Sequence, residues 1–312
     1  MSRSTSSRRS LNRALSVLAL TALTAGAVTA CGDHDSASQR STSPSTTSSA
    51  SPGTGQAVAA AGLHMIDNGG HRLAFHVTPG HGSVIVLDSG GGEDSSYWNG
   101  LVPRLHAATG ATVITYDRAG LGKSDVVPGP WSVESAVSDL ETGLRQLGVT
   151  KNVTLVSHSQ AGEVATYFAR NNPQVLSGAV LVDANLPPLF TDEEIARLVA
   201  LSEPQVSAAK KAPDKPQNRQ LISTAASFVA TNKAFHKVTW PNAVPATVIV
   251  SEKTPFDGSP EDAQRWRDAA ASFVQDGPNR TLVTAKGSSH DVPKGRPELV
   301  LKEIERMVAT QH

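Results

Sequence analysis

The 312-residue sequence contains a single cysteine, Cys31, so the chain cannot form a disulfide bond within itself. Its 28 Lys and Arg residues are balanced by 28 Asp and Glu residues, and no segment forms a basic face of the kind that binds nucleic acid. No group of His, Asp and Glu has the spacing of metal ligands. We therefore expect no nucleic-acid partner, no metal and no cofactor.

The first 31 residues have the features of an export signal. They carry four arginines and no acidic residue, and an apolar run extends from Ala14 to Val28. This run is too short, and too rich in Ala and Thr, to be a spanning helix, which needs roughly 20 apolar residues. The segment Ser7-Arg8-Arg9-Ser-Leu loosely matches a twin-arginine signal, so the twin-arginine and general secretory routes both stay open.

The apolar run ends in Val28-Thr-Ala-Cys31, which resembles the lipobox of bacterial lipoproteins. In that family the cysteine is lipidated and becomes the first residue of the mature chain. The resemblance implies a protein that is exported and held by Cys31 at the outer face of the bacterial cell membrane, or else secreted. Residues 32–57 are rich in Ser and Thr and cannot support a packed core, so we interpret them as a disordered tether.

Residues 58–312 alternate between apolar runs with strand composition and segments with helical signals. This alternation predicts an α/β fold with a mostly parallel sheet and helices on both faces. Asp67-Asn-Gly-Gly, between two strand-like runs, predicts a hairpin. Ser132 and Ser259 are expected to cap helices that run to Gly148 and Gln275. The predicted later strands lie in the apolar runs at 83–88, 112–116, 153–156, 179–182, 246–250 and 281–284.

The segment from about residue 187 to 241 contains no strand-like run. Thr191-Asp-Glu-Glu194 has the pattern of a capping box at the start of an amphipathic helix. An insertion of this length between two strands is either a lid or a disordered loop. Its apolar residues, Phe228 among them, favour an ordered helical cap over the site.

The segment from Val153 to Phe168 has the pattern of a nucleophile elbow. A strand-like run stops at Ser157, and helical spacing starts after Gly162. A strand that turns at once into a helix leaves room only for small residues beside the turn. Ser157 and Ala161 meet this requirement, although the motif G-x-S-x-G has glycines there. Ser159, at the apex, is the candidate nucleophile.

From about Ser83 onward the chain resembles an α/β-hydrolase, in the broad group with an esterase-like core and a helical cap. The blocks that carry this resemblance occur in the order and spacing of the family. They are Leu87-Asp-Ser-Gly-Gly-Gly-Glu-Asp-Ser-Ser-Tyr-Trp98, Tyr116-Asp-Arg-Ala-Gly-Leu-Gly-Lys-Ser-Asp125, Ser157-His-Ser-Gln-Ala-Gly162, Leu181-Val-Asp-Ala184 and Gly287-Ser-Ser-His-Asp-Val292.

A serine nucleophile needs a base, and histidine is the usual one. Of the ten histidines, His290 lies in the loop between the last strand-like run and the terminal helix, where the family places its base. His158 is adjacent to Ser159, but neighbouring residues of an elbow point in different directions, so we expect it to have a packing role.

The acid that orients the histidine has two usual positions, the ends of the two strands between elbow and histidine. At the commoner one, Ser251-Glu-Lys-Thr-Pro-Phe-Asp257 resembles the family's G-E-x-D-P pattern, but Thr254 stands where the aspartate would be. Asp183 occupies the other position and is the preferred candidate. Glu252 and Asp257 remain alternatives.

Negative charge that develops on the substrate oxygen needs hydrogen-bond donors. One candidate is the backbone N–H of Gln160, directly after the nucleophile. The resemblance places the second in the loop after the first buried strand, at Gly91, with Gly90 or Gly92 as alternatives.

These features predict a serine hydrolase that cleaves a small ester or related acyl substrate through an acyl-enzyme. Ser159 argues against an epoxide hydrolase or a haloalkane dehalogenase, which carry aspartate at the apex. An amidase or aminopeptidase with the same triad stays open. So does a non-catalytic binding protein on the same scaffold.

Overall fold

The computed structural model describes residues 58–253 and 259–310. The predicted export signal, Cys31 and the predicted tether lie outside the described residues, as do Thr254 and Asp257.

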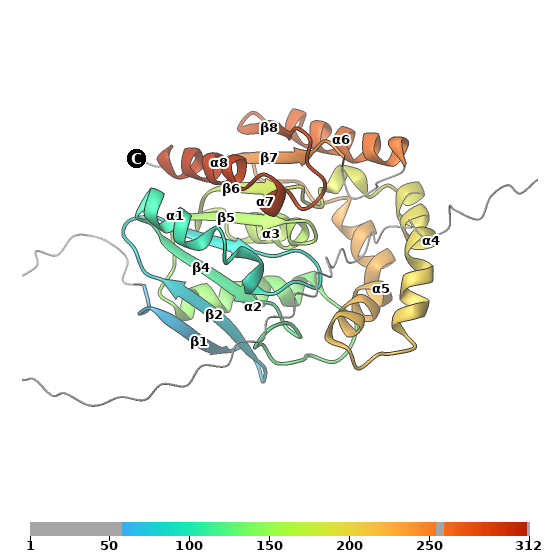
Figure 1. Cartoon of the computed structure of the whole chain (residues 1–312), viewed down its shortest axis with the longest axis horizontal. Helices are drawn as coiled ribbons and strands as arrows, with labels where there is room; N and C mark the ends of the chain where they lie inside the picture. Colours follow the sequence, from blue (N-terminus) through green and yellow to red (C-terminus); the bar gives the residue numbers. More distant parts are fainter. Residues whose placement is uncertain (1–57, 254–258, 311–312) are drawn as a thin grey trace, which may run out of the picture.

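An eight-stranded sheet forms the centre of the molecule, with the strand order β1-β2-β4-β3-β5-β6-β7-β8 (Figure 1). The pairs β1–β2 and β2–β4 are antiparallel, and the other neighbours are parallel. The α/β fold with a mostly parallel sheet is therefore confirmed. The strands are β1 (Gly62–Asp67), β2 (Arg72–Thr78), β3 (Val84–Asp88), β4 (Thr112–Asp117), β5 (Val153–His158), β6 (Leu176–Val182), β7 (Ala246–Ser251) and β8 (Arg280–Ala285).

The hairpin predicted from Asp67-Asn-Gly-Gly joins β1 to β2, with Asp67 paired to Arg72. Gly69 and Gly70 have φ values of 64° and 103°, in the region where glycine is favoured. The turn is closed by the N–H of Asn68, which donates to the carbonyl of His71.

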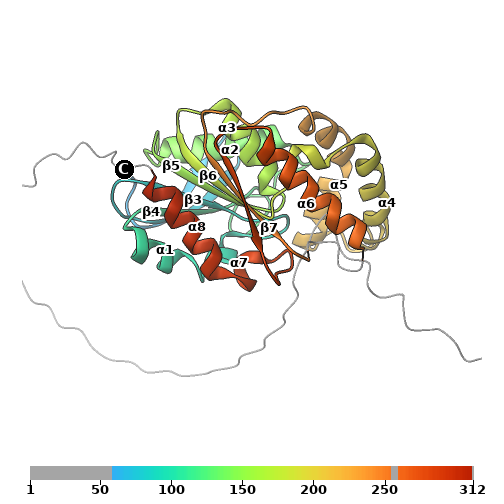
Figure 2. The ribbon, with the colours of Figure 1, turned by 90° about the horizontal axis from the view of Figure 1, so that it is seen from above.

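Helices cover both faces of the sheet, which explains why β3, β4 and β5 are buried along their whole length. Figure 2 shows α1 and α8 on one face and α2 and α3 on the other. No helix among the described residues is long and apolar enough to cross a bilayer. The helices that flank the sheet are α1 (Val102–Thr109), α2 (Val133–Gln146), α3 (Ala161–Asn171), α6 (Pro260–Gln275), α7 (Val292–Gly295) and α8 (Pro297–Ala309), with a 3-10 turn η1 at Ser95–Trp98.

The two predicted N-terminal helix caps, Ser132 and Ser259, are confirmed. The hydroxyl of Ser132 accepts from the N–H of Ser135 at the start of α2, and that of Ser259 accepts from Asp262 at the start of α6. Each satisfies one of the N–H groups that a helix start leaves without a partner.

The insertion between β6 and β7 is helical, as predicted. It contains η2 (Pro187–Leu189), α4 (Asp192–Ala209) and α5 (Pro216–Phe235), and Figure 1 shows α4 and α5 beside the sheet rather than within its layers. Thr191 caps α4 by accepting from the N–H of Glu194. The Glu194 side chain does not complete the capping box, because it pairs with Arg197 and with Arg265 of α6.

Candidate active site

Ser159, Asp183 and His290 lie together at one edge of the sheet. Ser159 follows β5 and Asp183 follows the neighbouring β6, so parallel pairing brings the two strand ends side by side. His290 lies between β8 and α7. His290 is 107 positions from Asp183 and 131 from Ser159 in sequence, and the fold brings the three residues into one hydrogen-bonded series.

The backbone at Ser159 is left-handed, with φ of 55°. This conformation is uncommon outside glycine and marks a constrained turn. Ser157 and Ala161 are fully buried, in agreement with the need for small residues there. Another chain segment lies very close to Gly162: a Cβ added to this glycine would be 2.2 Å from the carbonyl oxygen of Asn185. The elbow therefore depends on a glycine one position beyond the motif.

The candidate nucleophile and the candidate base are in direct contact. Nε2 of His290 lies 2.8 Å from the hydroxyl oxygen of Ser159. This distance is within the range of a hydrogen bond and allows the imidazole to accept the serine proton. His290 is 5% exposed, so its ring is held in place by packing.

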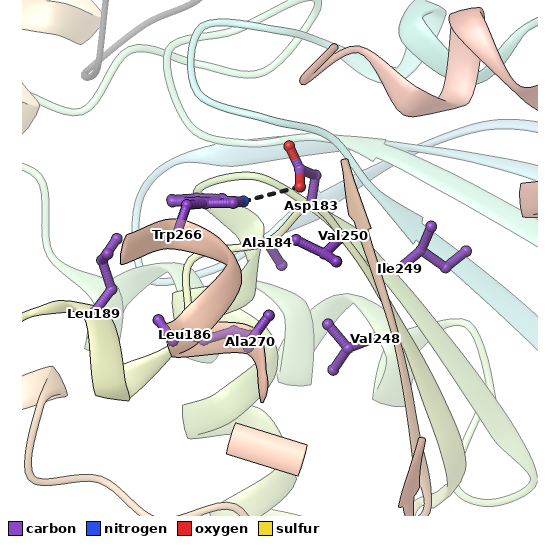
Figure 3. A pocket seen from close by; sticks show the side chains of 10 residues that line it. Asp183, Ala184, Leu186, Leu189, Val248, Ile249, Val250, Trp266 and Ala270 are labelled. Carbon is purple, nitrogen blue, oxygen red and sulfur yellow. Dashed lines mark hydrogen bonds between the residues drawn. The ribbon is translucent and has the colours of Figure 1, made fainter. Parts of the chain in front are cut away.

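Asp183 is the third residue of this hydrogen-bonded series, and it is almost inaccessible to solvent. Its Oδ2 lies 2.7 Å from Nδ1 of His290, and the residue is 1% exposed. Three further donors hold the carboxylate: the N–H of Ser251 at 2.7 Å, the hydroxyl of Ser251 at 2.8 Å and the indole N–H of Trp266 at 2.9 Å. Figure 3 shows Trp266 pointing at Asp183 above a small apolar cavity. Such charge-assisted bonds offset the cost of burying a carboxylate.

The alternative acids are not placed in this way. Glu252 is exposed, and its carboxylate accepts from the N–H of Gly287 at 2.7 Å. Asp257 and Thr254 lie outside the described residues. The end of β7, where the acid is commonly found, instead supplies Ser251 as a double donor to Asp183.

Sequence reasoning did not identify Ser251 and Trp266 as part of the site. Ser251 lies in the block at the commoner acid position, and Thr254 of that block indicates that this strand end has another role. Trp266 lies within α6, 83 positions after Asp183, and nothing in its local sequence points to the site. Only the packing of α6 against β7 brings the indole within reach.

The glycine loop after β3 lies against Ser159. A Cβ added to Gly90 would be 3.3 Å from Cβ of Ser159. The Gly90 carbonyl accepts from the buried guanidinium of Arg118, which also binds Asp88 and the carbonyl of Ser89. In a trans peptide the N–H points away from the preceding C=O, so this contact turns the N–H of Gly91 away from Arg118.

The second predicted donor, Gln160, is the N-cap residue of α3, which starts at Ala161. Within the part of the chain that the structure describes, the backbone N–H groups of Gly91 and Gln160 donate to no backbone acceptor. Both are therefore free to bind an oxygen of a ligand.

His158 packs behind the base, as predicted. Its ring is stacked on Tyr97 with centroids 5.1 Å apart, and Nε2 donates to the carbonyl of His290 at 3.1 Å. Burial, with a smaller contribution from His290, lowers the pKa of His158 to about 3. His158 is therefore neutral at neutral pH and braces the loop that carries the base.

Buried carboxyl groups surround the site. Burial raises the pKa of Glu163 to about 7, although the amide of Asn185 donates to this carboxyl at 2.7 Å. Burial likewise raises the pKa of Glu93 to about 7, against the opposing effect of Lys294. Burial also raises the pKa of Asp88, which the Arg118 charge offsets in part. In each case burial is the main cause, because it disfavours the charged form of a carboxyl group.

No group of three or more His, Cys, Asp or Glu residues in the described ranges is arranged to hold a metal ion. The described residues of the site bring together a serine hydroxyl beside an imidazole, a buried carboxylate bonded to the imidazole, and two backbone N–H groups.

Known proteins resemble this chain over most of the folded region. A probable transporter of Hormonema carpetanum, efuK, is 27% identical over 223 residues, covering 69% of this chain and 30% of the relative. The uncharacterised protein YqjL of Bacillus subtilis is 26% identical over 236 residues, covering 73% of this chain and 85% of the relative. The chain spans about a third of the length of the first curated relatives it matches.

Among solved structures, an esterase from Exiguobacterium antarcticum superposes with a TM-score of 0.60 at 17% identity, covering 80% of this chain and all of the esterase. At this identity the match concerns the fold alone. The model of the alpha/beta hydrolase family matches residues 85–303, a range that contains Ser159, Asp183 and His290. The chain therefore belongs to the alpha/beta hydrolase family.

Proposed function

We propose that the protein is a serine hydrolase that cleaves a small ester or a related acyl compound through an acyl-enzyme intermediate. The observation that carries this proposal is the continuous hydrogen-bonded chain from Ser159 through His290 to Asp183, with distances of 2.8 and 2.7 Å. This is the arrangement in which a base activates a serine hydroxyl and a carboxylate fixes the tautomer of the base.

In the proposed reaction, Ser159 attacks the substrate carbonyl while Nε2 of His290 takes the hydroxyl proton. Asp183 stabilises the imidazolium, and the N–H groups of Gly91 and Gln160 bind the oxygen that becomes negatively charged. His290 then gives its proton to the leaving group, whose bond to the carbonyl carbon breaks. A water molecule, activated by His290, releases the acid from Ser159.

Two alternatives use the same scaffold. A non-catalytic binding protein would not need a serine hydroxyl within hydrogen-bonding distance of a buried imidazole, so the geometry favours the enzyme. Amide hydrolysis would use the same groups. Esterases among the structural neighbours support the ester as the first substrate to test.

The direct test is turnover of p-nitrophenyl acetate by the purified protein and by its Ser159→Ala variant. We expect the variant to lose the activity and to lose covalent labelling by a fluorophosphonate. Ser96→Ala, which changes an exposed serine of η1, serves as the matched control and should retain both. Equal turnover by wild type and Ser159→Ala would refute the mechanism. A wild-type protein that is folded but neither labelled nor active would favour the binding protein.

We further propose that the enzyme is an exported lipoprotein anchored through Cys31. The support is the apolar run that ends in Val28-Thr-Ala-Cys31. The test is fractionation of cells that express the full chain or its Cys31→Ser variant. Wild type is expected in the membrane fraction, and the variant should not carry lipid. Recovery of both proteins in the same soluble fraction would contradict the anchor.

A further inference from the structure

A second cavity lies between the core and the helical insertion, apart from the candidate triad. Its volume is about 140 Å³, and its walls come from the loop between β4 and α2, the first turns of α2, His71 and the start of α5. In Figure 1 this loop lies beside the start of α5. Two hydrogen bonds join them: the N–H of Trp131 donates to the carbonyl of Ser223, and the Ser223 hydroxyl donates to the carbonyl of Gly129.

Two arginines from different elements line this cavity, and each has an Nε–H that is not used. Arg118, from the core, is 5% exposed, and Arg219 belongs to α5. Within the described residues the buried Nε–H of each lacks an acceptor. The other donors of Arg118 bind Asp88 and two loop carbonyls, and Arg219 donates to the carbonyl of Asp214. Buried donors without a partner are rare and call for a ligand or an ordered water.

The start of α2 adds to the positive potential. Ser132 and Ser135, at its N-terminus, line the cavity. The positive end of the helix dipole lies there, although the Ser132 hydroxyl already accepts from the N–H of Ser135 and donates to the exposed carboxylate of Glu134 at 2.9 Å. Among the described residues that line the cavity, Asp139 is the single carboxylate, and Asn68 and His71 contact it at 2.7 and 2.8 Å. Asp139 is seven residues along α2 from Ser132, about 10 Å away along the axis.

The remaining wall is apolar. Trp131, Pro130, Val126 and Val127 line the cavity, and both valines are more than 40% exposed. Charged groups at one end of a cavity and an apolar wall beside them fit a ligand that has one charged end and an apolar body. An inorganic anion would leave the apolar wall without a partner.

We propose that this cavity binds a small organic carboxylate, with its charged end at Arg219 and the start of α2 and its apolar body against Trp131. The site lies at the junction of core and insertion, and it also reaches Arg118, which holds the glycine loop beside Ser159. It is distinct from the acyl site of the proposed reaction.

The test is calorimetric titration of the full-length protein with benzoate, with benzyl alcohol as the uncharged analogue and inorganic phosphate as the anion without an apolar body. We expect benzoate to bind at one site and the other two compounds to bind at least about tenfold more weakly. Benzyl alcohol loses the charge-assisted hydrogen bond, and phosphate loses the apolar contact. Similar affinities for benzoate and either analogue would overturn the proposal, as would no binding of benzoate.

Arg219→Gln should weaken benzoate binding by about tenfold or more, whereas Arg219→Lys, which keeps the charge but has no Nε–H, should retain part of it and bind between wild type and Arg219→Gln. Arg104→Gln is the matched control, because Arg104 pairs with Glu298 on the surface and does not line the cavity. Thermal unfolding identifies any variant that does not fold. Binding that is unchanged in a folded Arg219→Gln protein would refute the site, and so would equal losses in the Arg104→Gln control.

Discussion

The indole N–H of Trp266 donates to Oδ1 of Asp183 across 2.9 Å, and this contact joins α6 to the candidate triad (Figure 3). Asp183 is held at a strained backbone position, with φ of 43°. The neighbouring turns of α6 carry Arg265 and Asp262, which pair with Glu194 and Arg197 of the insertion. One helix therefore contacts both the insertion and the carboxylate that is bonded to His290.

Removing this donor tests whether it supports the proposed triad. Trp266→Phe keeps most of the buried ring but leaves Oδ1 with the N–H of Ser251 alone. We expect kcat to fall by about tenfold with KM nearly unchanged, because a hydrogen bond to a charged group contributes about 1.5–3 kcal/mol.

Trp240→Phe is the matched control for Trp266→Phe. Trp240 is also buried, and its indole N–H donates to the carbonyl of Val244 at 2.8 Å. This variant should lose stability without a change in the kcat of the folded enzyme. Equal kcat values for the two variants would show that Trp266 has only a structural role.

The identity of the acid is tested by Asp183→Asn and Glu252→Gln. An amide at 183 offers its NH₂ or its carbonyl to Nδ1 and cannot stabilise the imidazolium, so kcat should fall on the order of a thousandfold or more. Glu252 is exposed and bonded to Gly287, so its variant should stay within about threefold of wild type, as is usual for surface sites. Comparable losses in both variants would contradict the assignment, and Asp257→Asn would then be the next variant to measure.

Stability should depend on pH through Glu163. Its pKa is raised from 4.5 to about 7 by burial, so the folded protein binds this proton more tightly than the unfolded chain. The free energy of unfolding should therefore decrease as pH rises from about 4.5 to about 7, by an amount on the order of 3 kcal/mol, and then level off.

Glu163→Gln should remove this dependence, because the neutral amide can still accept from Asn185. Denaturant titrations at about pH 4 and about pH 8 are the measurement, since the pH values lie on either side of the transition. The variant should match wild type at the lower pH and exceed it at the higher. A variant that is less stable than wild type at the higher pH would contradict the prediction.

The elbow should be more sensitive at Gly162 than at its motif positions. A Cβ at Gly162 would overlap the carbonyl oxygen of Asn185 at 2.2 Å and Cβ of Ala184 at 2.8 Å. Gly162→Ala should therefore cost about 1–3 kcal/mol of stability and displace Ser159. Gly100→Ala is the control, because a Cβ there meets nothing within 4 Å. Unfolding curves and p-nitrophenyl acetate turnover are measured together, and equal stability of the two variants would argue against the close approach.

Much of the fold could be predicted from local sequence. Continuous apolar runs such as Val84–Asp88 predicted buried strands, and Ser132 and Ser259 predicted helix starts, because strand burial and helix capping are set by residues adjacent in the chain. Ser159 and His290 could be selected because the chemistry of an elbow and its base imposes a recognisable pattern around each.

The sequence by itself determined the order of strands and helices, the turn at Ser159 and the candidate base. Tertiary structure decided which carboxylate meets His290, because that choice depends on how the ends of β6 and β7 pack and not on either segment alone. It also decided that Ser251 and Trp266 hold Asp183, and that Arg118 and Arg219 face one cavity. These pairs are distant in sequence, and side-chain contacts between distant segments leave no periodic or motif-like trace in the segments themselves.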